Sequence, residues 1–394
     1  MNRKKNTVAV VTTTRADYGI LYWTLKTLQN RDDIALKILA GGMHLDKKFG
    51  ETIEEIQSDG FSIEAEFDFL KKGHGRDSVL SMVESMATAT TLFAQYLNNN
   101  NVDMLLLIGD RFEMFAAAQA ALLMQVSVAH IHGGEITEGA VDDAIRHCIS
   151  KIACLHFTST EQHRRRVIQM GARPLSVVNV GAPSLESIIR EPLMDRVEIE
   201  KSIDLDFSQP LLLITYHSET LSSLSPDNQV KPLIEALKLF PEFQLLITGS
   251  NADAGGLIIS QYLQDYLNRR RGRHVWCQSL GRKRYLSILQ YVSVVVGNSS
   301  SGLIEVPSFC KPTVNIGNRQ KGRESAASVI HCEMVTESIV KAIQKALSYE
   351  FQGGLKTIKN PYGKGDSSKE IVSALSGWLG SSRAVEKFYD ITDK

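Results

Sequence analysis

The segment HIHGGEITEGAVDD, residues 130–143, brings many groups capable of chemistry into fourteen residues. It follows the short apolar run VSVA and holds two histidines and four carboxylates. Imidazole and carboxylate side chains transfer protons near neutral pH, and the same groups bind transition metals. The segment is therefore compatible with an acid/base site, with a metal site, or with a solvated loop whose acidic residues cap the next helix.

A metal site in this segment would use both histidines. His130 and His132 alternate along the expected strand, so both side chains would lie on the same face. Zinc would need further ligands, such as Glu135 and either Asp142 or Asp143. The chain contains no HExxH motif and no CxxC pair, so we favour an acid/base role and expect no metal. Asp142 and Asp143 could also simply cap the helix that follows and stabilise its dipole.

Two further strand ends carry groups that could transfer or stabilise protons. Asp110 and Arg111 follow the apolar run LLLI, where the carboxylate could act as a general base, as an orienting group or as a helix cap. His217 follows the run LLLITY. It could bind a phosphate or a leaving-group oxygen, or be a structural histidine at a domain surface.

The segment GNSSSGLIEVPS, residues 297–308, is compatible with a phosphate-binding turn. It follows the apolar run SVVV and opens a helix, so hydroxyl groups and helix N-terminal amides could hold a phosphate there. Ser299 and Ser300 are the candidates, and an ordinary serine cap is the alternative. Glu305, about one turn into the helix, could reach ribose hydroxyls or be solvated.

Basic residues in two loops could neutralise phosphate charge. Arg15 and Asp17 lie at the end of the first strand, in TTTRADYG, where arginine could bind a phosphate through two bonds. An exposed ion pair of small energetic value is the alternative. Arg319 and Arg323 lie in the glycine-bracketed loop GNRQKGR, which could be a basic lid or a plain turn.

These groups need a scaffold that brings strand ends together. Short β-rich apolar runs alternate with amphipathic stretches over residues 7–183 and again over residues 211–318. A repeated strand-then-helix pattern predicts parallel sheets covered by helices on both faces. We expect an α/β fold of two Rossmann-like doubly wound domains that face a central cleft, because ligands bind beyond the carboxyl ends of parallel strands.

A polar stretch at residues 189–210 interrupts the alternation and predicts a hinge near residues 185–208. We expect an N-terminal domain over residues 1–186 and a second domain over residues 187–367. The tail, residues 368–394, is expected to be helical and to pack back on the first domain.

Composition excludes several classes of partner. The 394 residues carry 44 basic and 44 acidic side chains, so their formal net charge is zero, which gives no electrostatic case for nucleic acid or an anionic membrane. No apolar run approaches the length of a membrane span, and the N-terminal run VAVV is too short for a signal peptide. Five cysteines without paired spacing favour reduced thiols and a cytoplasmic location.

The ordered motifs resemble one family of enzymes. TRADYG, GGMHLDKKFGET, GDRFE, HIHGGE, DDAIRH, GSNADAG, GNSSSGLIEVPS and NIGNRQKGR occur in this order, and together they resemble the hydrolysing UDP-N-acetylglucosamine 2-epimerases of bacterial sialic-acid biosynthesis and the epimerase half of the animal bifunctional enzyme. The resemblance implies the B-type glycosyltransferase architecture, with UDP held mainly by the second domain and the sugar by the first. It also implies a homodimer or homotetramer without a cofactor.

The resemblance assigns binding roles to individual residues. Ser299 and Ser300 would hold the β-phosphate, and Glu305 would hold the ribose. Arg282 takes the place of an aromatic residue near the uracil in the animal relatives, so contacts with the base are less secure. The other implied binding residues are Asn251 and Arg319 in the second domain and Arg15, Asp17, His44 and Arg111 in the first.

The implied reaction is elimination followed by hydration. A base removes the C2 proton while UDP leaves C1, with His217 and the arginines stabilising the leaving group, and 2-acetamidoglucal forms. Water then adds at C1 and a proton returns to C2 on the other face, which gives N-acetylmannosamine. Asp110 and Asp142 match the family's acid/base positions. Many relatives read HIEGGE where this chain reads HIHGGE, so either His132 or Glu135 supplies the third group.

Other functions share parts of this pattern. The same chemistry could act on UDP-2,4-diacetamido-2,4,6-trideoxyglucose, as in legionaminic-acid synthesis. A non-hydrolysing epimerase would keep UDP on its product, and a catalytically inactive sensor would bind UDP without turnover. A retaining glycosyltransferase shares the expected fold but would need an acceptor, and the ordered motifs fit the epimerases better.

Overall fold

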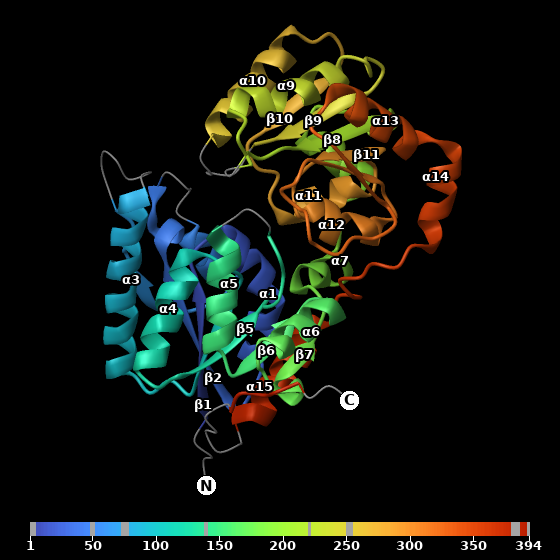
Figure 1. The fold of residues 1–394 in the computed structure, drawn as a ribbon. Coiled ribbons are helices and arrows are strands. Elements are labelled where there is room, and N and C mark those ends of the chain that lie inside the picture. Colours follow the sequence, from blue (N-terminus) through green and yellow to red (C-terminus); the bar gives the residue numbers. More distant parts are fainter. Residues whose placement is uncertain are drawn as a thin grey trace. The chain divides into compact units, whose positions relative to one another are not determined.

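The structure, a computed structural model, describes residues 5–47, 52–71, 79–137, 141–219, 222–249, 255–379 and 387–391. It divides into two compact units (Figure 1). Unit 1 takes the described residues up to Glu135, Val141–Ser187 and those from Gly363 onward. Unit 2 takes Ile188–Tyr362 together with Ile136 and Thr137.

Unit 1 is built on a parallel sheet of seven strands in the order β3-β2-β1-β4-β5-β6-β7. From β1 in the middle of the sheet the chain adds β2 and β3 on one side and then returns to add β4 on the other side of β1. A doubly wound sheet binds ligands where the strand order reverses in this way, at the carboxyl ends of β1 and β4. The strands are β1 (Asn6–Thr12), β2 (Ile34–Gly41), β3 (Ile63–Phe67), β4 (Met104–Ile108), β5 (Ser127–Ile131), β6 (Leu155–Thr158) and β7 (Val177–Asn179).

Helices cover both faces of this sheet, which explains why β4 is buried along its whole length. The helices are α1 (Arg15–Gln29), α2 (Ile53–Ser58), α3 (Val79–Asn99), α4 (Phe112–Leu123), α5 (Val141–Ile152), α6 (Glu161–Gln169), α7 (Glu186–Arg190, at the junction of the units) and α15 (Ser367–Leu379), with 3-10 turns η1 (Gly42–Leu45), η3 (Pro174–Ser176) and η4 (Pro183–Leu185).

The last helix, α15, is fixed to unit 1 by polar contacts as well as by packing on α1 (Figure 1). The buried carboxylate of Glu186 accepts hydrogen bonds from the backbone N–H of Ser368 at 2.8 Å and from its hydroxyl at 2.6 Å. The described part of the tail is helical over Ser367–Leu379, and residues 387–391 form no regular element.

Unit 2 repeats the plan with six parallel strands in the order β10-β9-β8-β11-β12-β13. Leu211 and Leu213 of β8 pack in one apolar cluster, whereas Leu212 and Ile214 pack in another, so both faces of this sheet are buried. The strands are β8 (Leu211–Thr215), β9 (Gln244–Thr248), β10 (His274–Cys277), β11 (Val294–Gly297), β12 (Thr313–Ile316) and β13 (Val329–Cys332).

The chain enters unit 2 through a structured segment. The polar stretch predicted as a hinge contains α8, whose first turn is closed by a capping box between Asp195 and Glu198. The helices of unit 2 are α8 (Arg196–Ser202), α9 (Pro226–Leu237), α10 (Gly256–Arg269), α11 (Arg282–Leu289), α12 (Ser301–Ile304), α13 (Thr336–Leu347) and α14 (Tyr349–Gly354), with 3-10 turns η5 (Val306–Phe309) and η6 (Leu355–Thr357).

The predicted α/β class with two doubly wound parallel sheets is confirmed. No helix in the described ranges is both long enough and apolar enough to cross a membrane.

Candidate active site

The turn after β1 is held together by its own side chains. The Thr14 hydroxyl caps α1 by accepting a hydrogen bond from the Asp17 N–H at 3.1 Å. The Asp17 carboxylate in return accepts hydrogen bonds from the Thr13 hydroxyl at 3.0 Å and from the Thr13 N–H at 3.3 Å. Burial raises the pKa of Asp17, and the nearby charge of Arg111 acts in the opposite direction. Asp17, predicted to bind substrate, thus shapes this turn.

Arg111 lies between β4 and α4, as the residue that precedes the helix, and forms the cationic centre of this edge. Its Nη2 donates to Oε1 of the fully buried Glu113 at 2.8 Å. Burial by itself would lower the pKa of Arg111, but the carboxylates of Glu113, Asp17 and Asp142 outweigh it and hold the pKa above its ordinary value. The side chain is still 34% exposed, so a permanent positive charge is available to an anionic ligand.

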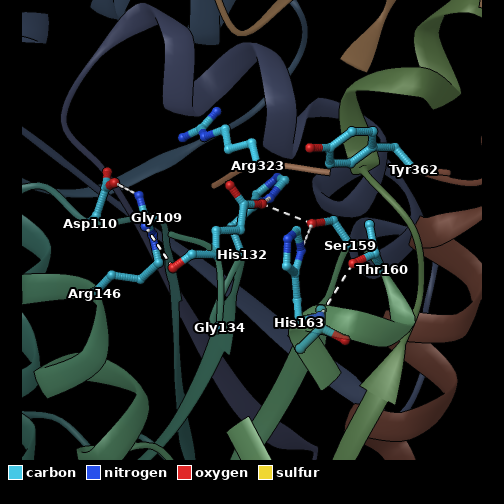
Figure 2. Close-up of polar contacts among 12 residues, drawn as sticks. Gly109, Asp110, His132, Gly134, Arg146, Ser159, Thr160, His163, Arg323 and Tyr362 are labelled. Carbon is cyan, nitrogen blue, oxygen red and sulfur yellow. Dashed lines mark hydrogen bonds and ion pairs between the residues drawn. The ribbon is translucent and has the colours of Figure 1, made fainter. Parts of the chain in front are cut away.

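Asp110 and the opening segment are linked by an arginine that sequence reasoning did not single out. Arg146 of α5 is almost fully buried, and its Nη2 binds the Asp110 carboxylate (Figure 2). Its Nη1 donates to the backbone oxygen of Glu135 at 2.9 Å and lies 3.5 Å from Oδ1 of Asp143. Arg146 belongs to the motif DDAIRH. The motif does not reveal how deeply the arginine is buried, and this burial is what shows its structural role.

His130 and His132 do not share a face, contrary to the prediction from strand alternation. The strand β5 ends at Ile131, and His132 has a φ of +67°, which turns its side chain out of the alternation. His130 is fully buried and donates from Nε2 to the Gly109 oxygen at 2.7 Å, while its Nδ1 lies 3.0 Å from the Ser150 hydroxyl. Burial lowers the pKa of His130 to about 3, so it is a neutral structural group.

His132 instead pairs with Glu135. Nδ1 of His132 lies 2.5 Å from Oε1 of Glu135, and the same oxygen accepts a hydrogen bond from Ser159 at 2.8 Å. Ser159 is in turn 3.0 Å from Nδ1 of His163 (Figure 2). Gly134, with φ of +78°, allows this loop to lie against α6, because a Cβ there would be 2.3 Å from the His163 backbone oxygen. Within the described ranges, no three His, Cys, Asp or Glu side chains are grouped to hold a metal ion.

The remaining predicted residues of unit 1 differ in how accessible they are. Asp142 is exposed in the first turn of α5, and its charge acts on Arg111. Arg15 is half exposed and forms an ion pair with Glu55 at 2.9 Å. His44 is buried, with Nε2 2.9 Å from the Thr12 hydroxyl and Nδ1 2.7 Å from the Thr52 hydroxyl. Both ring nitrogens of His44 are therefore occupied within the protein.

In unit 2, His217 and the serine-rich turn meet through Asn298. The His217 N–H donates to Oδ1 of Asn298 at 2.7 Å, and Nδ2 of Asn298 donates back to the His217 oxygen at 2.9 Å. The Asn298 backbone oxygen accepts from Gln320 at 2.8 Å and from Arg319 at 3.4 Å. Burial, and then the charge of Arg319, lower the pKa of His217 to about 3. Asn298 therefore joins β8, β11 and the 317–323 loop. It belongs to the motif GNSSSGLIEVPS, but the sequence did not predict this role.

The phosphate-binding prediction falls on a short helix. Ser300 precedes α12, but its side chain makes no capping hydrogen bond, so the alternative of an ordinary serine cap is not observed for Ser300. Ser299 and Ser300 are both partly exposed. Glu305 comes directly after the last residue of α12, not within it, because the helix is only four residues long.

The loop that carries Arg319 is held by Glu219, another residue that sequence reasoning missed. Oε1 of Glu219 accepts hydrogen bonds from the N–H of Asn318 at 2.8 Å and of Arg319 at 3.1 Å. Arg282, predicted near the uracil, forms an ion pair with Glu191 at 2.7 Å. Asn251, the remaining predicted binding residue, lies outside the described residues.

The fold matches that of solved nucleotide-sugar enzymes. The crystal structure of the UDP-GlcNAc 2-epimerase from Neisseria meningitidis bound to UDP-GlcNAc aligns with a TM-score of 0.81. The alignment covers 94% of this chain and 100% of the other at 18% identity.

Sequence comparison then gives the family. The family model described as UDP-N-acetylglucosamine 2-epimerase matches residues 26–376. The hydrolysing GDP/UDP-N,N'-diacetylbacillosamine 2-epimerase of Campylobacter jejuni is 35% identical over 348 residues, which cover 88% of this chain and 89% of the relative. The polysialic acid biosynthesis protein P7 of Escherichia coli is 34% identical over 388 residues, 98% of each chain. This chain belongs to the UDP-N-acetylglucosamine 2-epimerase family, as its motifs predicted.

Proposed function

We propose that this protein is a hydrolysing UDP-N-acetylglucosamine 2-epimerase, which converts UDP-N-acetylglucosamine and water into N-acetylmannosamine and UDP. The observation that carries the proposal is the grouping at the carboxyl edge of the unit 1 sheet. Asp110, His132 and Asp142 can all transfer protons. Arg146 of α5 binds the Asp110 carboxylate and the backbone oxygen of Glu135, the partner of His132, and the charge of Asp142 acts on the permanent cation Arg111. Family membership and the names of the relatives support the same reaction.

In the first half of the reaction the C2–H bond breaks and its electron pair forms the C1=C2 double bond. The C1–O bond breaks at the same time, and its electron pair leaves on the β-phosphate of UDP. The C2 proton is not acidic, so early stabilisation of the leaving diphosphate lowers this barrier. Arg111 in unit 1 and Arg319 in unit 2 suit that task because guanidinium groups bind phosphates with directed hydrogen bonds.

In the second half, water adds a hydroxyl group to C1 and a proton returns to C2 on the opposite face. Asp110 and Asp142 are assigned to this acid/base work. Arg146 holds the Asp110 carboxylate in place, and Asp142 is exposed in the first turn of α5, where it can exchange protons with solvent.

Unit 2 is assigned to UDP. The partly exposed Ser299 and Ser300 and the amides around them would bind the β-phosphate, and Glu305 would bind the ribose. The pKa of about 3 keeps His217 neutral, so this side chain can donate a hydrogen bond to the leaving oxygen without carrying charge. Arg282 and Asn251 are assigned to the remaining nucleotide contacts.

Turnover of two nucleotide sugars tests this proposal. UDP-N-acetylglucosamine and UDP-2,4-diacetamido-2,4,6-trideoxyglucose are each incubated with the protein, free UDP is measured, and the sugar product is identified by NMR. We expect UDP and free N-acetylmannosamine from the first substrate, in a pathway to a sialic or related nonulosonic acid. UDP-N-acetylmannosamine without free sugar would contradict hydrolysis. Faster turnover of the second substrate would assign the activity in the name of the Campylobacter jejuni relative to this chain as well.

We also propose that the protein works in the cytoplasm as a homodimer or homotetramer. Light scattering of the purified protein at several concentrations tests the oligomeric state, and a monomer at all concentrations would contradict it.

A further inference from the structure

A hydrogen-bonded chain of buried groups lies behind His132. It runs from Nδ1 of His132 to Oε1 of Glu135, from that oxygen to the Ser159 hydroxyl, and from the hydroxyl to Nδ1 of His163. The His132 side chain is 12% exposed and the Glu135 side chain 5%, while Ser159 and His163 are buried. The chain therefore has one end within reach of a ligand, and that end is an imidazole.

The bonds of this chain have a definite direction. An ionised carboxylate only accepts hydrogen bonds, so Oε1 of Glu135 accepts one from Nδ1–H of His132 and one from the Ser159 hydroxyl. Ser159, having donated its proton, accepts from Nδ1–H of His163. This arrangement assigns the Nδ1–H tautomer to His132, and it leaves Nε2 with a lone pair.

We propose that His132 is the base that removes the C2 proton, through Nε2, and that Glu135 and Ser159 are positioning residues that act through it. This inference rests on the proposed epimerase function. A carboxylate bound to Nδ1–H fixes the orientation of an imidazole and stabilises the imidazolium that forms when Nε2 takes a proton. Asp110 has no comparable arrangement, because its carboxylate is already bound to the buried guanidinium of Arg146.

The proton balance of this step is complete. Nε2 of His132 takes the proton from C2, the electron pair of the C2–H bond becomes the new double bond, and UDP leaves with the pair of the C1–O bond. When water adds, the hydroxyl group goes to C1 and an equivalent proton goes to C2 from the opposite face. The proton on Nε2 passes to solvent, which matches the one proton released when the phosphate ester becomes free UDP.

The two halves of the reaction can be measured separately. In His132→Gln we expect UDP release to fall roughly 100- to 10,000-fold, the usual contribution of an acid/base group. The same variant, given 2-acetamidoglucal, should still hydrate it to N-acetylmannosamine within about twofold of the wild-type rate. Added imidazole should restore part of the UDP release in His132→Gly. Loss of hydration with intact elimination, or unchanged UDP release, would overturn the assignment.

Glu135 and Ser159 are tested by a double-mutant cycle with a matched control. Glu135→Gln and Ser159→Ala should lower kcat with little change in KM, and neither should lower it further in the His132→Gln background. Glu161→Gln makes the same carboxylate-to-amide change at an exposed position of the neighbouring helix and should have no effect. Losses that simply multiply in the double variants would show that these residues do not act through His132.

A measurement without substrate separates this inference from the proposed function. The ¹⁵N shifts of labelled histidine report the tautomer directly, and we expect the Nδ1–H form of His132 in the wild type and a mixture of tautomers in Glu135→Gln. An Nε2–H tautomer in the wild type would overturn the inference even if the protein is an epimerase. A wild-type protein that shows the Nδ1–H form but releases no UDP from either sugar would instead contradict the proposed function.

Discussion

Arg146 and Asp110 form an ion pair that joins α5 to the end of β4. The guanidinium also holds the backbone of Glu135, so one buried side chain sets the positions of the loops after β4 and β5. Burial of an arginine is costly unless every charge is paired, and the arrangement is therefore sensitive to its loss.

We expect Arg146→Met to destabilise the protein by about 3–5 kcal/mol, the usual cost of removing the buried partner of an ion pair. Chemical denaturation of the purified variant measures this. Arg165→Met, at a side chain that is 79% exposed, is the control and should change the unfolding free energy by less than about 0.5 kcal/mol. Equal stabilities of the two variants would contradict the structural role of Arg146.

Asp110→Asn should remove a reacting carboxylate while keeping the shape of the side chain. We expect kcat to fall roughly 100- to 10,000-fold, with little change in UDP affinity because UDP is assigned mainly to unit 2. Calorimetric titration with UDP and a turnover assay check the two parts. Asp204→Asn, at a side chain that is 91% exposed, should leave both unchanged. A variant that keeps its full turnover would contradict the role of Asp110. Normal UDP binding without turnover in the wild type, unchanged by Asp110→Asn, would favour the UDP-binding sensor over the enzyme.

Two glycines should respond in opposite directions to the same change. Gly297 has a φ of +145°, and a Cβ there would lie 1.9 Å from the Thr215 backbone oxygen, so Gly297→Ala should destabilise unit 2 and lower UDP binding. Gly377 lies inside α15 with no atom within 4 Å of such a Cβ. Gly377→Ala should therefore stabilise the protein by about 0.5–1 kcal/mol. Thermal unfolding of both variants, compared with the wild type, decides the signs.

Stability should decrease as the pH falls from about 6.5 toward 4. Burial, the largest cause in each case, lowers the pKa of His44 to about 4 and the pKa values of His130 and His217 to about 3. Below pH 6.5 the unfolded chain therefore takes up protons that the folded chain does not, and this difference favours unfolding. Denaturation midpoints across this range should show a smaller slope in His130→Asn than in the wild type. An unchanged slope would contradict the neutral state of His130.

The features of the fold that depend on local sequence pattern could be predicted. Continuous apolar runs such as β4 and β8 predicted a doubly wound fold, because parallel strands buried on both faces need such runs. The strand β3 lacks such a run, because its burial alternates along the sequence IEAEF, as expected of a strand at the edge of the sheet.

The site could be predicted only as far as residue types allow. Strand-end positions identified Asp110, Arg111 and His217, because the carboxyl ends of parallel strands meet at one edge. Residues that act through distant partners could not be found this way. Arg146, Asn298 and Glu219 each hold a backbone far away in the sequence, and nothing in their immediate neighbours indicates the contact. The alternation that placed His130 and His132 on one face failed because a single residue at positive φ ended it.

The attachment of α15 by Glu186 also determines the order in which the chain can mature during synthesis. All the described elements of unit 2 after the junction, from α8 through η6, are translated before Ser368, the partner of Glu186 in unit 1. Unit 2 can complete its sheet while the ribosome is still adding residues, but unit 1 has to wait for the last helix to cover α1. A fragment that ends at residue 362 would thus contain all the described elements of the second unit but lack the last helix of the first.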